Sequence, residues 1–286
     1  MLVRRLVPGQ EAVVQAFLEA HAASTMFLQA ALHQAGLGAG EGRTYGFWMG
    51  AFRDGALVGV VAHLRLGNVV LQAPTGLPLL LDRLADEPRG WPVRGFVGPR
   101  AQVVAAREHP RSPKTVPVVD TAEVLYDLAL DDLIVPPAAV DGRLECVIPC
   151  EADLELLVRW GVAYNVETLG AVTGPRAERS WRARVRDSIH QQRIFLLLRD
   201  GEPVSMSGFN ATVPSCVQIG GVFTPPALRR HGFARACVAG SLVFAMGRGV
   251  ARAVLFTEPD NPARRAYEAI GFREVGRYRV LLYELP

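Results

Sequence analysis

The stretch VFTPPALRRHGFA, residues 222–234, decides the fold because it joins a buried strand to a helix through a basic turn. Residues 216–223 are apolar and rich in β-forming side chains, which predicts a buried strand. Pro225 and Pro226 end that strand, since proline cannot donate to a ladder. From Phe233 to Met246 apolar residues recur at helical spacing, so the order strand, turn, helix is predicted.

The turn itself, Arg229-Arg230-His231-Gly232, has the chemistry of an anion site. A helix start offers unpaired N–H groups and the positive end of a dipole, which together can hold a pyrophosphate. Gly232 lets the backbone approach closely, and the arginines add charge. Neither a P-loop nor a Gly-x-Gly-x-x-Gly motif occurs, which argues against nucleotide hydrolases and Rossmann enzymes. The alternative is an ordinary strand–turn–helix with basic residues at its rim.

A second motif follows the next predicted strand and contains a tyrosine. Asn261 is a good N-cap residue, and Pro262 suits the first helical position. Gly271 is typical of a helix end, with Phe272 beyond it for the hydrophobic contact. Tyr267 lies on the short helix that these residues delimit. Alternatively, Tyr267 is a half-buried aromatic residue that only packs one face of a short amphipathic helix.

Taken together, the two motifs resemble the acyl-CoA site of GNAT-type N-acetyltransferases. Arg229-x-x-Gly-x-Ala234 is similar to the diphosphate loop of that family, and Asn261-Pro-x5-Tyr-x3-Gly-Phe272 is similar to the segment that flanks the pantetheine arm. The resemblance implies acetyl-CoA as co-substrate and no metal. It assigns the cofactor contacts to Val222, Phe223, Thr224, Arg229, Arg230, His231, Gly232, Phe233, Ala234, Arg235, Asn261 and Tyr267.

GNAT chemistry is direct attack by a neutral amine on the acetyl thioester. The resemblance implies that Gly220–Phe223 splays from its neighbour, so that the Val222 backbone N–H stabilises the oxyanion. Tyr267 is then the general acid, because a pKa of about 10 keeps it protonated at neutral pH. The family often has a glutamate base on the cofactor strand, but this strand has none. Glu167 is the favoured base and Glu258 the other candidate; a water chain, with both carboxylates merely solvated, is the alternative.

The chain has 286 residues, half of them hydrophobic, which is enough for two cores. A linker rich in proline and glycine, residues 136–142, predicts domains at 1–138 and 139–286. The second half reads β-α-α-β-β-β-α-β-α-β, with a last strand at Arg277–Leu285. The resemblance extends to bacterial tandem GNAT proteins. It implies an α/β (α+β) fold of two GNAT-like domains, each a mixed, largely antiparallel sheet flanked by helices.

The first half is predicted to be a degenerate GNAT-like copy that has lost its phosphate loop. A hairpin at Arg53–Ala56 parallels one at Arg199–Glu202, and each joins two predicted strands. Val69–Ala73 is the counterpart of the cofactor strand, but no Arg-x-x-Gly follows it. The alternative is an unrelated α/β domain with similar hairpins.

Charge and composition limit the partners. A formal net charge of +3 argues against nucleic acid, and no apolar run is long enough to span a membrane. Four cysteines without a signal-peptide context favour a cytoplasmic protein. We therefore expect an enzyme that acetylates a primary amine of a small molecule or peptide. A non-catalytic acyl-CoA sensor and an acetyltransferase that modifies protein or tRNA are the rival functions; a homodimer follows from family analogy alone.

Overall fold

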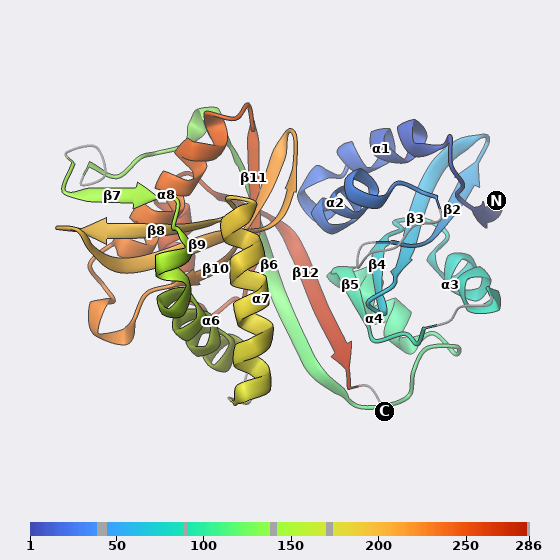
Figure 1. Cartoon of the computed structure of the whole chain (residues 1–286). Coiled ribbons are helices and arrows are strands. Elements are labelled where there is room, and N and C mark those ends of the chain that lie inside the picture. The colour runs from blue at the N-terminus through green and yellow to red at the C-terminus, as the bar shows by residue number, and fades with distance from the viewer. Residues whose placement is uncertain (39–44, 88–90, 138–141, 170–173, 285–286) are drawn as a thin grey trace. The chain divides into compact units, whose positions relative to one another are not determined.

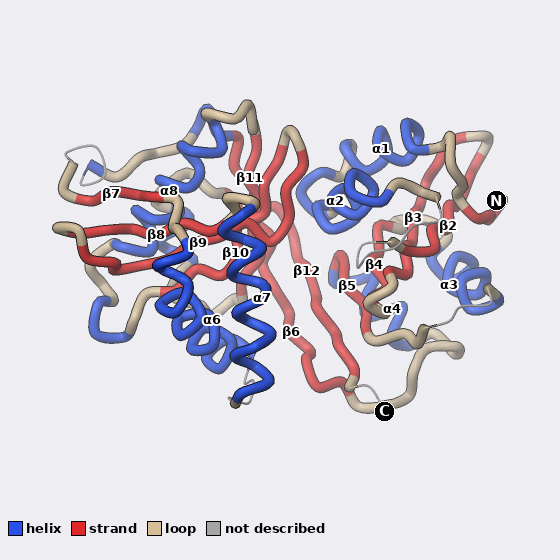
Figure 2. Tube along the Cα trace, in the orientation of Figure 1, coloured by secondary structure: helices blue, strands red, loops and turns tan. Residues whose placement is uncertain are grey.

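A computed structural model describes residues 1–38, 45–87, 91–137, 142–169 and 174–284 (Figures 1 and 2). The chain forms two compact units. The first comprises 1–126, 256–259 and 274–286, and the second comprises 127–255 and 260–273. Most of the linker predicted between two domains, residues 138–141, lies outside the described residues. None of the helices in the described ranges is both long enough and apolar enough to span a membrane.

The first unit is a sheet with helices. Within it the strand order is β1-β2-β3-β4-β5-β12-β6. The strands are β1 (Leu2–Arg5), β2 (Gly46–Arg53), β3 (Ala56–Leu64), β4 (Asn68–Gln72), β5 (Gly95–Pro99), β6 (Pro117–Ala129) and β12 (Arg273–Tyr283). The helices are α1 (Glu11–Glu19), α2 (Met26–Ala35), α3 (Leu77–Asp86) and α4 (Arg100–Glu108), with the 3-10 turns Ala22–Ser24 and, where the units meet along the chain, Leu130–Asp132.

The second unit contains residues 222–234, the strand–turn–helix segment described above. Its strand order is β11-β10-β9-β8-β7. The strands are β7 (Leu144–Val147), β8 (Ile194–Arg199), β9 (Glu202–Val213), β10 (Cys216–Phe223) and β11 (Arg252–Thr257). The helices are α6 (Leu154–Leu169), α7 (Pro175–His190), α8 (Phe233–Met246) and α9 (Arg264–Glu268), with the 3-10 turns Glu151–Asp153 and Pro226–Leu228. The mostly antiparallel sheets with flanking helices confirm the predicted fold class.

In the second unit the helices cover both faces of the sheet. Leu196 packs in the apolar cluster of α6 and α7, whereas its neighbour Leu197 packs in the cluster of α8. Because successive strand residues point to opposite faces, α6 and α7 lie on one face and α8 on the other. Figure 1 shows α6 and α7 side by side across β8, β9 and β10.

The two units share two local features, of which the sequence predicts the first, the pair of similar hairpins. Both hairpins are tight turns in which the two central residues are left-handed: Asp54 and Gly55 have φ of 51° and 82°, and Asp200 and Gly201 have 52° and 81°. Such values require Gly, Asp or Asn and match the twist of the strands. In each unit a parallel pair of strands, β4 with β5 and β10 with β11, is registered over three residues.

The last strand corrects the predicted element order of the second half. β12 pairs antiparallel with β5, from Tyr278↔Pro99 to Leu282↔Gly95, and its residues from Glu274 onward belong to the first unit. Leu281 and Tyr283 are buried in that unit's apolar cluster, which explains the placement. The strand was expected to close the second half; its predicted end, Leu285, lies outside the described residues.

Candidate functional site

Strand β10 leaves its regular pairing at the end that carries the motif. Its register with β11 runs from Cys216↔Arg252 to Gln218↔Val254 and stops there. Against β9 the register steps from Gly220↔Gly208 to Phe223↔Met206, so one extra residue is accommodated on β10. Gly221, with φ of 60°, and Val222 have no partner in this register. The bulge is the geometry that an oxyanion contact from the Val222 N–H requires, and the contact itself stays a prediction.

The turn after β10 is held by hydrogen bonds from its first residues. Thr224 is buried, and its hydroxyl lies 2.9 Å from the Ser205 hydroxyl. Ser205 also donates to the Phe223 carbonyl at 3.1 Å. The Arg229 Nε donates to the Thr224 carbonyl at 2.9 Å and so closes the turn from its far side. These bonds fix the path of the chain between the strand and the helix.

Helix α8 begins at Gly232 with its first N–H groups uncapped. Gly232 is left-handed, with φ of 80°, and no side chain caps the helix start. A Cβ atom built on Gly232 would have Arg235 Nη2 at 3.6 Å as its one neighbour within 4 Å in the described structure. The His231 ring stacks on Phe233, with centroids 5.5 Å apart. The preceding residue, Arg230, is exposed and also left-handed, with φ of 66°.

The helix start has a surplus of positive charge. Arg229, Arg230 and Arg235 surround it, and the Arg235 Nε is buried without a hydrogen-bond partner among the described residues. A buried donor of this kind is costly unless something binds it. An uncapped helix start beside an unpaired guanidinium nitrogen therefore fits a diphosphate. By contrast, the described residues contain no group of three or more His, Cys, Asp or Glu that could hold a metal ion.

One face of α6 lies against the same region. Trp160, Tyr164 and Glu167 are spaced four and three residues apart, which places them on one side of a helix. The Trp160 ring lies 6.1 Å from the Phe223 ring, centroid to centroid. The Glu167 carboxylate accepts from Arg229 Nη2 at 2.7 and 2.8 Å. The candidate base is thus brought to the predicted phosphate loop, where it is ion-paired with one of the loop arginines.

Tyr267 lies on a helix that is shorter than the sequence predicted: α9 is flanked by Ala263 and Ala269, without a side-chain cap, so Asn261 is not its N-cap, and Asn261 and Gly271 lie outside it. The Ala263 N–H donates to Asn261 Oδ1 at 2.9 Å at the start of this segment. At its end Gly271 has φ of 106°, and the Phe272 N–H donates to the Tyr267 carbonyl at 3.2 Å. A side chain on Gly271 would lie 2.7 Å from the Asp132 carbonyl oxygen, so only glycine fits there.

The Tyr267 phenol is buried, and the burial raises its pKa well above the usual value; the nearby Tyr164 raises it further. The phenol therefore stays protonated throughout the neutral range. Its ring meets Phe272 edge-on, with centroids 6.2 Å apart. Tyr164 and Tyr267 come from separate elements, α6 and α9, so their proximity brings the helix of Glu167 next to the motif of Tyr267.

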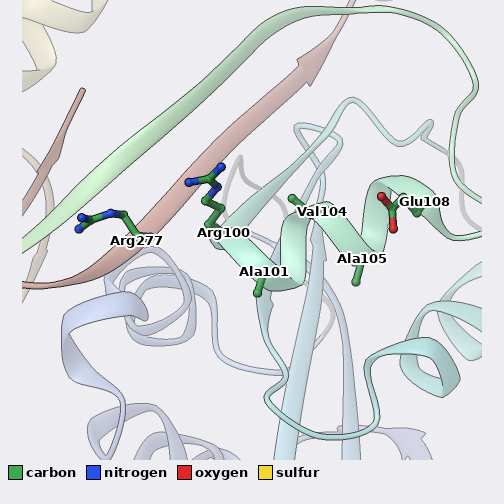
Figure 3. A pocket seen from close by; sticks show the side chains of 6 residues that line it. All are labelled: Arg100, Ala101, Val104, Ala105, Glu108 and Arg277. Carbon is green, nitrogen blue, oxygen red and sulfur yellow. The ribbon is translucent and has the colours of Figure 1, made fainter. Parts of the chain in front are cut away.

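One candidate base belongs to a different unit from the other predicted site residues. Glu258, the second candidate base, is exposed and belongs to the first unit, whereas Glu167 and Tyr267 belong to the second. A hollow of about 520 Å³ on the first unit is lined by α4 and Arg277 and includes none of the predicted site residues (Figure 3).

The sequence did not single out two residues of this region. Trp160 had a signal, because it precedes Tyr164 and Glu167 on one helical face. Gln218 also had one, as the single polar side chain in the otherwise apolar or glycine run of β10. Neither residue stands out in the sequence, because each lies in a segment that core packing explains.

The sequence profile of the acetyltransferase (GNAT) family matches residues 162–272, which contain both motifs and the Glu167 segment. This segment is a GNAT acetyltransferase domain. The chain therefore contains an acyltransferase domain, and the predicted resemblance is confirmed for residues 162–272. No curated protein matches the chain in sequence.

Solved structures share the fold over nearly the whole chain. A GNAT-family acetyltransferase from Colwellia psychrerythraea is 13% identical, with a TM-score of 0.54, over 99% of this chain and 100% of that one. A GCN5-related N-acetyltransferase from Sphaerobacter thermophilus is 16% identical, with a TM-score of 0.57, over 98% and 94%. A tandem GNAT protein from the clavulanic acid biosynthesis pathway is 14% identical, with a TM-score of 0.54, over 98% and 97%. At such low identity these likenesses show the fold alone.

Proposed function

We propose that this GNAT acyltransferase transfers the acetyl group of acetyl-CoA to a primary amine of a small molecule or peptide. The observation that carries the proposal is the uncapped start of α8 at Gly232, beside the unpartnered Arg235 Nε. The bulge in β10 lies a few residues before it along the chain. A diphosphate at the helix start would place the rest of acetyl-CoA toward the strand whose pairing is interrupted.

In this proposal each predicted contact has a physical task. The first N–H groups of α8, with Phe233 and Ala234, bind the diphosphate, and Arg229, Arg230, His231 and Arg235 supply charge and donors. The backbone from Val222 to Thr224 pairs with the pantetheine amides in place of a strand. Asn261 holds the segment that brings Tyr267 to the sulfur.

Acetyl-CoA would supply the thioester carbonyl that the amine attacks. A C–N bond forms, the C–S bond breaks, and the amine loses one proton while the thiolate gains one. The Val222 N–H stabilises the negative charge on the carbonyl oxygen. Tyr267 gives its proton to the leaving sulfur, which is consistent with a phenol kept protonated by burial.

Glu167 is the proposed acceptor of the amine proton. Its carboxylate is bound by Arg229, but a carboxylate has about four acceptor positions and Arg229 takes two. Since a diphosphate would also attract Arg229, cofactor binding would weaken the ion pair and leave Glu167 more available. Glu258 stays the other candidate.

The ion pair also favours a second function, an acyl-CoA sensor without turnover, because Arg229 occupies the favoured base. The two functions differ in thiol release. An enzyme releases free CoA from acetyl-CoA in the presence of an amine, whereas a sensor is stabilised by acetyl-CoA and releases none above background.

Tyr267→Phe tests the enzymatic proposal. Removing the phenol should lower kcat by about 10²-fold, the usual range for a lost general acid, and leave the affinity for acetyl-CoA unchanged. In the wild type, kcat should not fall from ionisation of Tyr267 between about pH 7 and pH 9.5, because the raised pKa keeps it protonated. Thiol release against pH measures both effects. Equal kcat in the variant would remove Tyr267 as the acid.

We further propose that residues 1–138 and 139–286 are copies of one domain type, with the last strand taken by the first copy. The cytoplasmic location, the bacterial origin and a homodimer are likewise proposals, supported by composition and family analogy.

A further inference from the structure

Gln218 is a buried polar side chain without a partner. It is 2% exposed, and both its Oε1 and its Nε2 are buried with no hydrogen bond among the described residues. A carboxamide can form up to four hydrogen bonds, and leaving all of them unmade in the interior destabilises the fold. Buried polar groups are paired in most native structures, so this one needs an explanation.

Its place on β10 is the point where the strand separates from β11. Gln218↔Val254 is the last registered pair of that ladder, and Val222 follows four residues later. The side chain lies on the face covered by α6 and α7. Leu196, in the cluster of those helices, pairs with Met206; Gly208 is two residues farther on β9 and pairs with Gly220. Gln218 precedes Gly220 by two residues and so shares its face.

The first unit offers an internal comparison. Its parallel ladder, β4 with β5, ends at Val70↔Val97, so Val70 stands where Gln218 stands in the second unit. Val70 is buried in an apolar cluster with residues of α1 and α2. The first unit has no Arg-x-x-Gly after its strand. Valine is therefore sufficient for core packing at this position. The carboxamide is present in the unit that carries the two motifs and absent at the corresponding position of the other unit.

We propose that Gln218 positions the acceptor for acetyl transfer. A neutral carboxamide cannot take the amine proton, so it is not the base. Its oxygen accepts a hydrogen bond from the amine N–H, and its Nε2 donates to an oxygen on the same molecule. The acceptor class is thus a primary amine with a neighbouring carbonyl or hydroxyl oxygen. This inference rests on the proposed function, because it needs an amine beside the thioester.

The test uses the full chain, the wild type and Gln218→Val, which installs the residue of the first unit. Glycinamide and isobutylamine are the probes, because they have nearly the same shape and differ in the carbonyl oxygen and amide. The wild type should prefer glycinamide at least 10-fold in kcat/KM, after correction for the neutral fraction of each amine. In Gln218→Val the preference should fall below about twofold, mainly through a higher KM for glycinamide, since a site built to hydrogen-bond discriminates strongly.

Thermal unfolding separates this role from a structural one. Removal of an unpartnered carboxamide should leave the Tm of Gln218→Val equal to or above that of the wild type. The stabilisation by acetyl-CoA should be the same in both proteins. A lower Tm in the variant would mean that Gln218 has a structural partner, and would overturn the inference.

The outcomes also distinguish failure of the role proposed for Gln218 from failure of the proposed acetyltransferase function. Equal discrimination between the amines in both proteins, or no acetylation of glycinamide by a wild type that acetyl-CoA stabilises, would overturn the role of Gln218. Absence of stabilisation by acetyl-CoA in the wild type would instead contradict the proposed function itself.

Discussion

At the scale of single residues, the contact between Arg229 and Glu167 links cofactor binding to proton transfer. Both side chains are partly exposed, with the guanidinium 2.7 Å from the carboxylate. An ion pair of this exposure contributes little to stability, about 0–1 kcal/mol. Its interest is chemical, because a diphosphate and Glu167 would compete for one guanidinium group.

Glu167→Gln should separate the role of Glu167 in proton transfer from its effect on the binding of acetyl-CoA. Loss of the carboxylate should lower kcat by about 10²-fold, the typical contribution of a general base. The Kd for acetyl-CoA should stay equal or decrease, because Arg229 loses its anionic partner. Steady-state thiol release and calorimetric titration give the two values. A kcat equal to that of the wild type would exclude Glu167 as the base.

Gly271 shows how one residue can be required for two reasons. Its φ of 106° disfavours a side chain, and a Cβ atom would lie 2.7 Å from the Asp132 carbonyl. Gly249 has a φ of 82° and no atom within 4 Å of its Cβ position, so it is the matched control. Gly249→Ala should cost about 1–2 kcal/mol of unfolding free energy from backbone strain alone.

Gly271→Ala should cost at least about 1 kcal/mol more than the control, because the clash adds to the strain. Denaturant unfolding of both variants measures the difference. An equal decrease in unfolding free energy in the two variants would show that the Asp132 carbonyl moves aside without destabilising the fold, so that the clash contributes nothing.

At the scale of elements, strand, turn and helix around the motifs could be predicted because local chemistry determines them. Pro225, Gly232 and Asn261 act on their immediate neighbours, and the structure places the boundaries close to them. The face formed by Trp160, Tyr164 and Glu167 was harder, since its importance depends on β10 and α9, which are distant in sequence. The importance of Gln218 is hidden in the sequence for the same reason. Its lack of a partner is a property of the folded surroundings, and composition does not reveal it.

The elements α3, β5 and α4 were not predicted, although α3 has a clear apolar stripe at Leu77, Leu80, Leu81 and Leu84. Pro78 made its start look like part of a turn, but proline is tolerated in the first turn of a helix. Long-range pairing of β5 with β12 leaves no local signal. Turn-forming residues before α3 therefore hide a helical periodicity that is present in the sequence.

At the scale of the whole molecule, the chain returns its last strand to its first unit. This placement could not be read from the sequence, since the apolar pattern of β12 suits any sheet with a free edge. Leu281 is fully buried in the core of the first unit, between residues of β2, β4 and α3. The C-terminal strand is thus part of the N-terminal core.

Leu281→Ala should therefore destabilise the first unit. A buried Leu→Ala change costs about 2–5 kcal/mol, depending on how far the site collapses. Hydrogen–deuterium exchange should show faster exchange in β2, β4 and β5, with β8, β9 and β10 affected less. Loss of protection confined to β8–β10 would contradict the assignment of β12 to the first unit.

The central claim is that the start of α8 binds the diphosphate of acetyl-CoA, and thermal unfolding tests it most directly. The proteins are the wild type, Gly232→Asp and the control Gly249→Asp, which changes a glycine of similar φ beyond the other end of the same helix. Acetyl-CoA at 100 times its Kd should add about 2.7 kcal/mol, or a Tm shift of about 2–4 °C, to the wild type and the control. Gly232→Asp should show no shift, because a carboxylate would stand where the diphosphate binds. An equal shift in all three proteins, or none in the wild type, would contradict the account.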